Sequence, residues 1–148
     1  GIAAVIITHQ MSVVSRIADQ VAVMEHGRVI EQGDVVQVFA HPQQELTRQF
    51  VETVVPQKLP LAIEQEVHSG KFNRVIRAVH TGGAARDLIS DFGAQGVHAS
   101  LLHASDAALR RQSVGTVVLG LSAQNASLID ASLASLSNRP GLDVEEVN

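Results

Sequence analysis

The sequence begins with a continuous apolar run, Ile2 to Ile7, that is rich in β-branched residues. Such a run is typical of a strand covered on both faces, as in the parallel sheet of an α/β protein. It predicts a strand that needs sheet neighbours. At six residues it is far shorter than the roughly 20 residues that span a bilayer. Because the chain opens inside this apolar run and without a start methionine, we expect it to be a piece of something longer.

The residues after this run alternate between helical and strand patterns. Apolar spacing and turn residues support these assignments, and Asp34 is well suited to cap the helix that follows it. The predicted elements are a helix at Met11–Ala18, a strand at Val21–Met24, a turn at 25–28, a strand that ends at Gly33, a helix at 35–40 and a helix from Pro42 to about Val54. This alternation favours an α/β fragment.

A short linker is predicted at Val54–Leu61, where two prolines lie within five residues. Each proline disfavours helix in the residue before it. We therefore expect two domains, residues 1–58 and residues 59–148.

The second domain has the pattern of an α+β protein. Its predicted elements are a strand at Leu61–Val67, a helix at Phe72–Val79 that continues after a break over Ala84–Phe92, strands at Val97–Ala104 and Val114–Leu121, a helix at Ala123–Ser137 capped by Ser122, and a strand at Leu142–Val147. The order β-α-β-β-α-β predicts a ferredoxin-like fold with both helices on one face of the sheet.

Composition excludes several classes of function. Aromatic residues make up 3% of the chain and the net charge is −4, so a base-stacking, basic nucleic-acid surface is not expected. Cysteine is absent, which removes disulfides, thiolate metal sites and a cysteine nucleophile. No secretory signal pattern opens the chain. The composition is that of a mildly acidic, aliphatic globular protein.

Thr8 and His9 are the sharpest local candidates for chemistry. They follow the predicted Ile2–Ile7 strand, and the carboxyl end of a parallel strand is where α/β sheets bind ligands. A neutral imidazole there can hydrogen-bond a phosphate or position a water. The alternative is a loop histidine with no role.

Residues 1–55 resemble the end of an ABC-transporter ATPase domain. The string from Ile6 to Gly33, with Thr8-His9, a helix, a strand and a Gly-Arg hairpin, carries the resemblance. It implies that His9 is the switch histidine, which contacts the γ-phosphate of ATP, and that Gln10 belongs to its loop. ATP and Mg would be cofactors of the intact subunit. Because the sequence has no phosphate-cradling G-x-x-x-x-G-K-[ST] loop, no signature motif and no Walker B acidic pair, this chain alone is expected to be inactive as an ATPase.

Residues 61–148 resemble the NIL domain of methionine-importer ATPases. The segments that carry the resemblance are 67–70, 97–104 and 115–121, followed by an amphipathic helix and the strand at 142–147. The resemblance implies a ferredoxin-like fold, a homodimer and inhibitory binding of L-methionine. Ser100, Leu101 and Leu102 are the best candidates for the amino-acid site. Ser100 stands where the family usually carries Asn, and serine lacks the paired donor and acceptor of an amide.

Together the two resemblances imply part of the ATP-binding subunit of a bacterial importer for methionine or a related amino acid. That subunit would lie on the cytoplasmic face of the cell membrane, against a membrane permease. Two alternatives remain for residues 59–148: a dimerisation module that has no ligand, and a sensor for a different small ligand.

Metal and hydrolase sites are not expected. His98 and His103 are five residues apart on a predicted strand and are therefore expected to face opposite sides. No known zinc-ligand spacing and no G-x-S-x-G elbow is present. We expect Arg110 and Arg111 to lie on a solvated hairpin.

Overall fold

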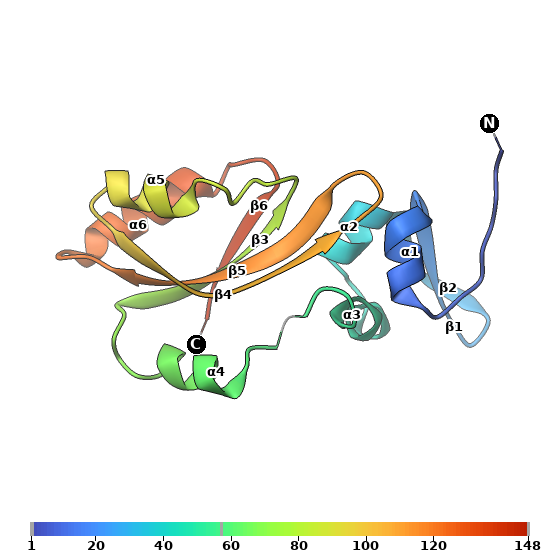
Figure 1. Cartoon of the computed structure of the whole chain (residues 1–148), viewed down its shortest axis with the longest axis horizontal. Helices are drawn as coiled ribbons and strands as arrows, with labels where there is room; N and C mark the ends of the chain where they lie inside the picture. The colour runs from blue at the N-terminus through green and yellow to red at the C-terminus, as the bar shows by residue number, and fades with distance from the viewer. Residues whose placement is uncertain (1, 57, 148) are drawn as a thin grey trace.

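The computed structural model describes residues 2–56 and 58–147. A small N-terminal part and a larger C-terminal part follow each other along one long axis (Figure 1). None of the helices within the described ranges is long and apolar enough to cross a membrane. The N-terminal part contains α1 (Met11–Ile17), β1 (Gln20–Glu25), β2 (Arg28–Asp34), α2 (Val35–Ala40) and α3 (Glu45–Glu52), and the C-terminal part contains α4 (Leu61–Val67), β3 (Arg74–Thr81), α5 (Leu88–Ala94), β4 (His98–Ala108), β5 (Ser113–Ser122), α6 (Ala126–Leu136) and β6 (Leu142–Glu146).

Local sequence signals account for most of the N-terminal part. Strands β1 and β2 form an antiparallel hairpin, and both turn residues, His26 and Gly27, have positive φ, as tight hairpin turns require. Asp34 accepts a hydrogen bond from the backbone N–H of Val36 at 2.8 Å and so caps α2. The predicted helices at 11–18 and 35–40 are confirmed. Strand β2 continues one residue past Gly33, and α3 begins at Glu45, later than Pro42.

The predicted strand at Ile2–Ile7 is wrong for this chain. These residues have no regular secondary structure, and the side chains of Ile2, Val5 and Ile7 are 97%, 93% and 98% exposed. A strand of a parallel sheet is stabilised by hydrogen bonds to neighbouring strands and by helices on its faces. The described residues supply neither to this segment, which extends away from α1 (Figure 1).

The C-terminal part is built on one antiparallel sheet with the strand order β4-β5-β3-β6. Helices α5 and α6 cover one face (Figure 1). Between them and the sheet lies a core in which Ile76, Leu119 and Ile129 are 0–1% exposed. This is an α+β arrangement, and its elements follow the predicted order β-α-β-β-α-β.

The first strand and helix of that order were predicted at the wrong residues. Residues Leu61–Val67 form helix α4, and the expected helix at Phe72–Val79 is instead strand β3 from Arg74 to Thr81. Ile76 and Ala78 of β3 face the α5–α6 core, and on the other face Val75 is buried and Val79 packs against the inter-part cluster, so apolar residues occur at odd and even positions. Apolar residues at 75, 76 and 79 therefore imitate helical spacing. In α4 the alternation of apolar and polar residues extends over only a few positions, and the high helix propensity of Ala, Glu and Gln favours a helix over the predicted strand.

The remaining predictions for the C-terminal part differ from the structure mainly at element ends. Strand β4 continues to Ala108, beyond the predicted end at Ala104. Helix α6 begins at Ala126, because Asn125 rather than Ser122 is its cap: the Asn125 side chain accepts from the backbone N–H of Ser127 at 3.0 Å. The predicted last strand is confirmed as β6.

The N-terminal part packs against the sheet face opposite α5 and α6, at the end of the β4–β5 hairpin. One buried cluster joins the two parts, which we call the inter-part cluster. Val55, in the predicted linker, belongs to it and is 1% exposed. Residue 57 of that linker lies outside the described residues. The domain boundary at residue 58 stays a prediction. The buried members of the inter-part cluster are Met11, Val35, Val36, Phe39, Ala40, Val51, Val55, Ala107, Leu109 and Val114.

Gly115 of β5 allows a close approach by β4, which predicts sensitivity to a single methyl group. A Cβ at Gly115 would lie 2.5 Å from the carbonyl oxygen of Ser105 and 2.6 Å from Oδ1 of Asp106. We expect Gly115→Ala to lower the free energy of unfolding by about 1–3 kcal/mol, because the backbone of β4 must shift. Urea unfolding measures this.

Gly93→Ala in α5 is the matched control. A Cβ there meets nothing within 4 Å, and alanine favours helix, so this variant should be as stable as the wild type or more stable. Equal stability of Gly115→Ala and wild type would contradict the tight β4–β5 approach.

Candidate functional site

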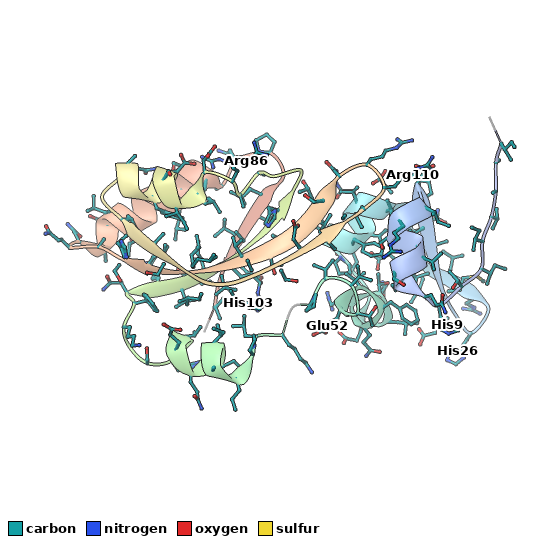
Figure 2. All side chains as sticks on the ribbon, viewed as in Figure 1. His9, His26, Glu52, Arg86, His103 and Arg110 are labelled. Carbon is teal, nitrogen blue, oxygen red and sulfur yellow. The ribbon has the colours of Figure 1, made fainter. Side chains whose placement is uncertain are left out.

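His9 lies at an exposed bend directly before α1 (Figure 2). The hydroxyl of Thr8 accepts a hydrogen bond from the backbone N–H of Gln10 at 3.0 Å, which fixes the turn between the apolar run and the helix. Gln10 is the N-cap residue of α1 and is also exposed. The imidazole of His9 is therefore presented to solvent by a short, hydrogen-bonded turn.

The other candidates, Ser100, Leu101 and Leu102, lie on β4, an outer strand of the four-stranded sheet. The pairing of β4 with β5 shifts by one residue between Leu101 and His103, so Leu102 is the extra residue of a β-bulge. The side chain of Leu101 is 55% exposed. An outer strand has free backbone N–H and C=O groups along one edge, and here that edge is irregular next to an exposed leucine.

The bulge corrects the prediction that His98 and His103 face opposite sides. In the register, His98, Ser100 and His103 pair with Ser122, Gly120 and Val118, which alternate along β5 and so share one face. Without the extra residue at Leu102, the odd spacing would have separated the two histidines. The hydroxyl of Ser100 lies 3.3 Å from Nε2 of His98. The two side chains together offer a donor and an acceptor on the exposed face.

The guanidinium of Arg77 lies on the same face of the sheet as His98, Ser100 and His103. Arg77 of β3 pairs in register with Val118, the same residue that pairs with His103. Its guanidinium Nη1 is 3.5 Å from Oε1 of Glu145 on β6. The face opposite α5 and α6 therefore carries imidazole, hydroxyl and guanidinium groups, which are the groups that bind carboxylates.

Arg110 and Arg111 lie on an exposed hairpin between β4 and β5, as expected from the sequence, but both also contact the N-terminal part. For Arg110 these contacts are to Asp19 and Ile17: Nη1 of Arg110 lies 2.8 Å from Oδ2 of Asp19 and 3.3 Å from the carbonyl oxygen of Ile17. Arg111 approaches the other oxygen of Asp19 at 3.3 Å. The residues in contact are about ninety positions apart in the chain, so a local sequence pattern does not predict these contacts.

Two further polar contacts hold the chain after the β1–β2 hairpin. The carboxylate of Glu31 accepts hydrogen bonds from the backbone N–H groups of Gln43 and Gln44 at 3.0–3.1 Å, and so fixes the start of α3. Burial alone would raise the pKa of Glu31, but the nearby Thr47 hydroxyl, these backbone hydrogen bonds and the charge of Arg48 outweigh it and lower the pKa. His41 Nε2 lies 2.8 Å from Oδ2 of Asp143, which links the N-terminal part to β6.

His80 is a buried histidine at the end of β3. It is 9% exposed, and its Nδ1 has no hydrogen-bond partner among the described residues. Burial lowers the pKa of His80, because desolvation disfavours the imidazolium. The Asp106 carboxylate opposes that shift; His80 and Asp106 pair with Gly115 from its two sides. Burial therefore favours the neutral imidazole of His80.

Among the described residues, the candidate residues form no metal centre. Within residues 2–56 and 58–147, no group of three or more His, Asp or Glu side chains is placed to hold a metal ion. The two best-formed surface hollows are lined by residues of β1, β2 and α3 and by residues of β3, α6 and β6. Neither hollow is lined by His9 or Ser100.

Known proteins resemble this chain over nearly its whole length. A methionine import ATP-binding protein of Leifsonia xyli is 39% identical over 150 residues, which cover 99% of this chain and 43% of the relative. The corresponding protein of Corynebacterium diphtheriae is 36% identical over 151 residues, which cover 99% and 42%. That of Shouchella clausii is 36% identical over 138 residues, which cover 89% and 39%. No family model matches the chain.

These relatives show that the chain is homologous to ATP-binding subunits of ABC transporters. More particularly, it is homologous to the C-terminal part of methionine import ATP-binding proteins, at about 35% identity. The chain spans less than half the length of these relatives. The resemblance found in the sequence is confirmed.

The buried His80 predicts a pH-dependent stability. Its pKa in the folded chain is below the ordinary value of about 6.5, so the unfolded chain binds more protons between these two pKa values. The free energy of unfolding should therefore decrease as the pH falls from 7 to 5, by at most about 1.4 kcal/mol per pH unit from this group. Urea unfolding across that range measures the slope.

His80→Gln should flatten this dependence, because glutamine does not titrate. His68→Gln, which changes an exposed histidine of the same part, should leave it unchanged. If His80→Gln keeps the wild-type slope, another group causes the pH dependence.

Proposed function

We propose that this chain is the C-terminal part of the ATP-hydrolysing subunit of a bacterial ABC importer for methionine or a related amino acid. The observation that carries the proposal is the identity of 36–39% to methionine import ATP-binding proteins over 99% of the chain. In this proposal residues 1–58 end the ATPase domain, and residues 59–148 are a NIL-like domain that binds the amino acid and inhibits transport.

The topology of the C-terminal part supports a ferredoxin-like domain. Six elements follow the order β-α-β-β-α-β, and the strand order β4-β5-β3-β6 places each helical crossover around an antiparallel neighbour. Both crossover helices cover one face, which leaves two sheet edges, and the part of the opposite face that the N-terminal part does not cover, for a ligand and a partner (Figure 1).

The chemistry of β4 fits one end of an amino acid. The Ser100 hydroxyl and His98 Nε2, 3.3 Å apart, can together bind a carboxylate or an ammonium group. Free edge groups near the bulge add backbone donors and acceptors. Leu101 pairs with Leu119 and so lies on the other face of β4 from Ser100, but its exposed side chain offers an apolar contact at the same strand edge. Because serine alone lacks the paired groups of an amide, we propose that His98 supplies the missing one.

His9 is proposed to be the switch histidine of the intact subunit, with Gln10 beside it. Its exposed imidazole before α1 is free to reach a phosphate. The described residues do not otherwise fit ATP: no phosphate-cradling loop is present in the sequence, and neither surface hollow includes His9. We therefore propose that ATP and Mg are held by other parts of the intact subunit, and that this chain contributes His9 alone.

The proposed partners are a second copy of the subunit and a membrane permease, with the complex at the cytoplasmic face of the cell membrane. The edge of β4 favours self-association, because it presents Leu101 beside free backbone groups. The other edge, β6, carries Asp143, Glu145 and Glu146, and acidic side chains disfavour pairing with another copy.

Binding of L-methionine tests the ligand. Titration of L-methionine into the chain should give saturable heat in the micromolar range. We expect Ser100→Ala and His98→Ala each to weaken binding about tenfold, since each removes one hydrogen bond to a charged group of the ligand. Ser100→Asn should bind at least as tightly as the wild type.

Ser90→Ala is the control, because Ser90 is exposed on α5, on the covered side of the sheet. Equal affinity of Ser90→Ala and Ser100→Ala would move the site away from β4. Absence of heat with L-methionine, combined with saturable heat for another amino acid, would indicate a sensor for a different ligand.

Self-association is tested by a charge at the β4 edge. Leu101→Lys should lower the dimer association constant about tenfold or more, because a buried ammonium without a partner is strongly disfavoured. Ile89→Lys is the matched control, because Ile89 on α5 is similar in size to leucine and is 47% exposed. This variant should leave the dimer association constant unchanged. Sedimentation or light scattering at several concentrations measures the constant, and equal effects of the two variants would exclude the β4 edge.

A second candidate function is a dimerisation module without a ligand. The observation that favours it is the outer position of β4 with Leu101 55% exposed on it, because an exposed apolar side chain on a strand edge suits pairing with a second copy. A stable dimer that gives no heat with any amino acid would support this candidate over the sensor.

A further inference from the structure

Two arginines at the tip of the β4–β5 hairpin contact the C-terminal end of α1 and the residue Asp19 that follows it. Arg110 donates from Nη1 to Oδ2 of Asp19 at 2.8 Å and to the carbonyl oxygen of Ile17, the last residue of α1, at 3.3 Å. The last carbonyls of a helix lack intrahelical partners and carry partial negative charge, so a guanidinium stabilises this end. Arg111 reaches the second oxygen of Asp19 at 3.3 Å.

The other end of α1 is attached to the same hairpin through apolar packing. Met11, the first residue of α1, is 9% exposed and belongs to the inter-part cluster. That cluster also contains Ala107, Leu109 and Val114 from the hairpin. Met11 follows His9 by two residues, so the cluster shared with the hairpin lies near the His9 end of α1, while Arg110 contacts the other end; Figure 2 shows His9 and Arg110 at these two ends.

Strand β4 connects this hairpin to the candidate ligand site. It runs without interruption from His98 to Ala108 and is paired with β5 on both sides of the bulge. Ser100 and Leu101 therefore lie on the same paired strand that leads to Arg110. A ligand that binds at the bulge therefore contacts the strand that carries the hairpin tip.

We propose that the β4–β5 hairpin couples the amino-acid site at Ser100–Leu102 to His9, with Arg110 as the positioning residue. This inference rests on the proposed function. The bound ligand stabilises the docked hairpin, and the docked hairpin holds α1, and with it the turn of His9, against the sheet. A ligand shifts this equilibrium only by the difference in its affinity for the docked and undocked arrangements.

Hydrogen–deuterium exchange of the α1 amides, in the chain with and without saturating L-methionine, tests the coupling. Without ligand, Arg110→Ala should speed the exchange of residues 11–18 severalfold, and Arg110→Lys should restore much of the protection. With ligand, exchange in the wild type should slow about fivefold, and Arg110→Ala should lose this effect. Arg86→Ala removes an exposed arginine from the turn before α5, away from α1, and should behave as the wild type (Figure 2).

Calorimetry on the same variants supplies an independent readout. Because coupling is reciprocal, Arg110→Ala should weaken L-methionine binding by the same factor of about five. Asp19→Asn changes the opposite side of the contact and should reproduce both effects if Arg110→Ala fails to fold. The coupling is overturned if L-methionine binds but leaves α1 exchange unchanged, or if Arg110→Ala leaves α1 exchange unchanged without ligand. If no amino acid binds the wild type, the ligand-sensing part of the proposed function is overturned together with the coupling; if another amino acid binds, the same two measurements with that amino acid decide the coupling.

Discussion

Burial of the central strands on both faces is the constraint on which the rest of the structure depends. Leu119 faces the α5–α6 layer and Val114 faces the N-terminal part, and both are at most 1% exposed. An antiparallel sheet commonly leaves one face in water. Here the N-terminal part covers one end of that second face, so the two parts share apolar contacts worth about 25 cal/mol for each Å² removed from water.

Charged contacts define how the two parts meet. Arg110 reaches Asp19 at one end of the inter-part cluster, and His41 reaches Asp143 of β6 at another place. These pairs are partly exposed, so each contributes little to overall stability. These pairs instead fix how the two parts are oriented. Apolar packing alone allows one part to shift along the other, whereas a guanidinium that contacts both a carboxylate and a helix-end carbonyl allows one orientation.

Much of the fold could be predicted from the sequence where the signals are local. The Asp34 cap, the Gly27 turn and the apolar spacing of α1 determine the N-terminal elements without long-range information. Strand β3 could not be placed, because two-sided burial removes the alternation that identifies a strand. The Ile2–Ile7 run has the composition of a strand, but a strand forms only with neighbours, and composition does not supply them.

The candidate site was predictable in part, for a related reason. Sequence resemblance identified His9 and Ser100 as candidates, but not the partner of Ser100, since His98 reaches it through strand geometry. The β-branched residues of β3 were an available signal for that strand. No comparable signal marks the bulge or the contact of Arg110 with Asp19, because both depend on register and tertiary packing.

The bulge at Leu102 divides β4 into two halves that serve opposite layers of the molecule. Before it, Ala99 packs with the α5–α6 core, and after it, Ala107, also an odd-numbered residue, packs with the N-terminal part. The extra residue changes the face to which the later side chains of β4 point, so that one strand contributes side chains to two separate cores. If Leu102 instead paired with Val118 in an unbulged ladder, every later residue of β4 would change face and Ala107 would turn toward the helix layer, away from the cluster around Phe39, so the pairing register here is as strongly constrained as any side chain.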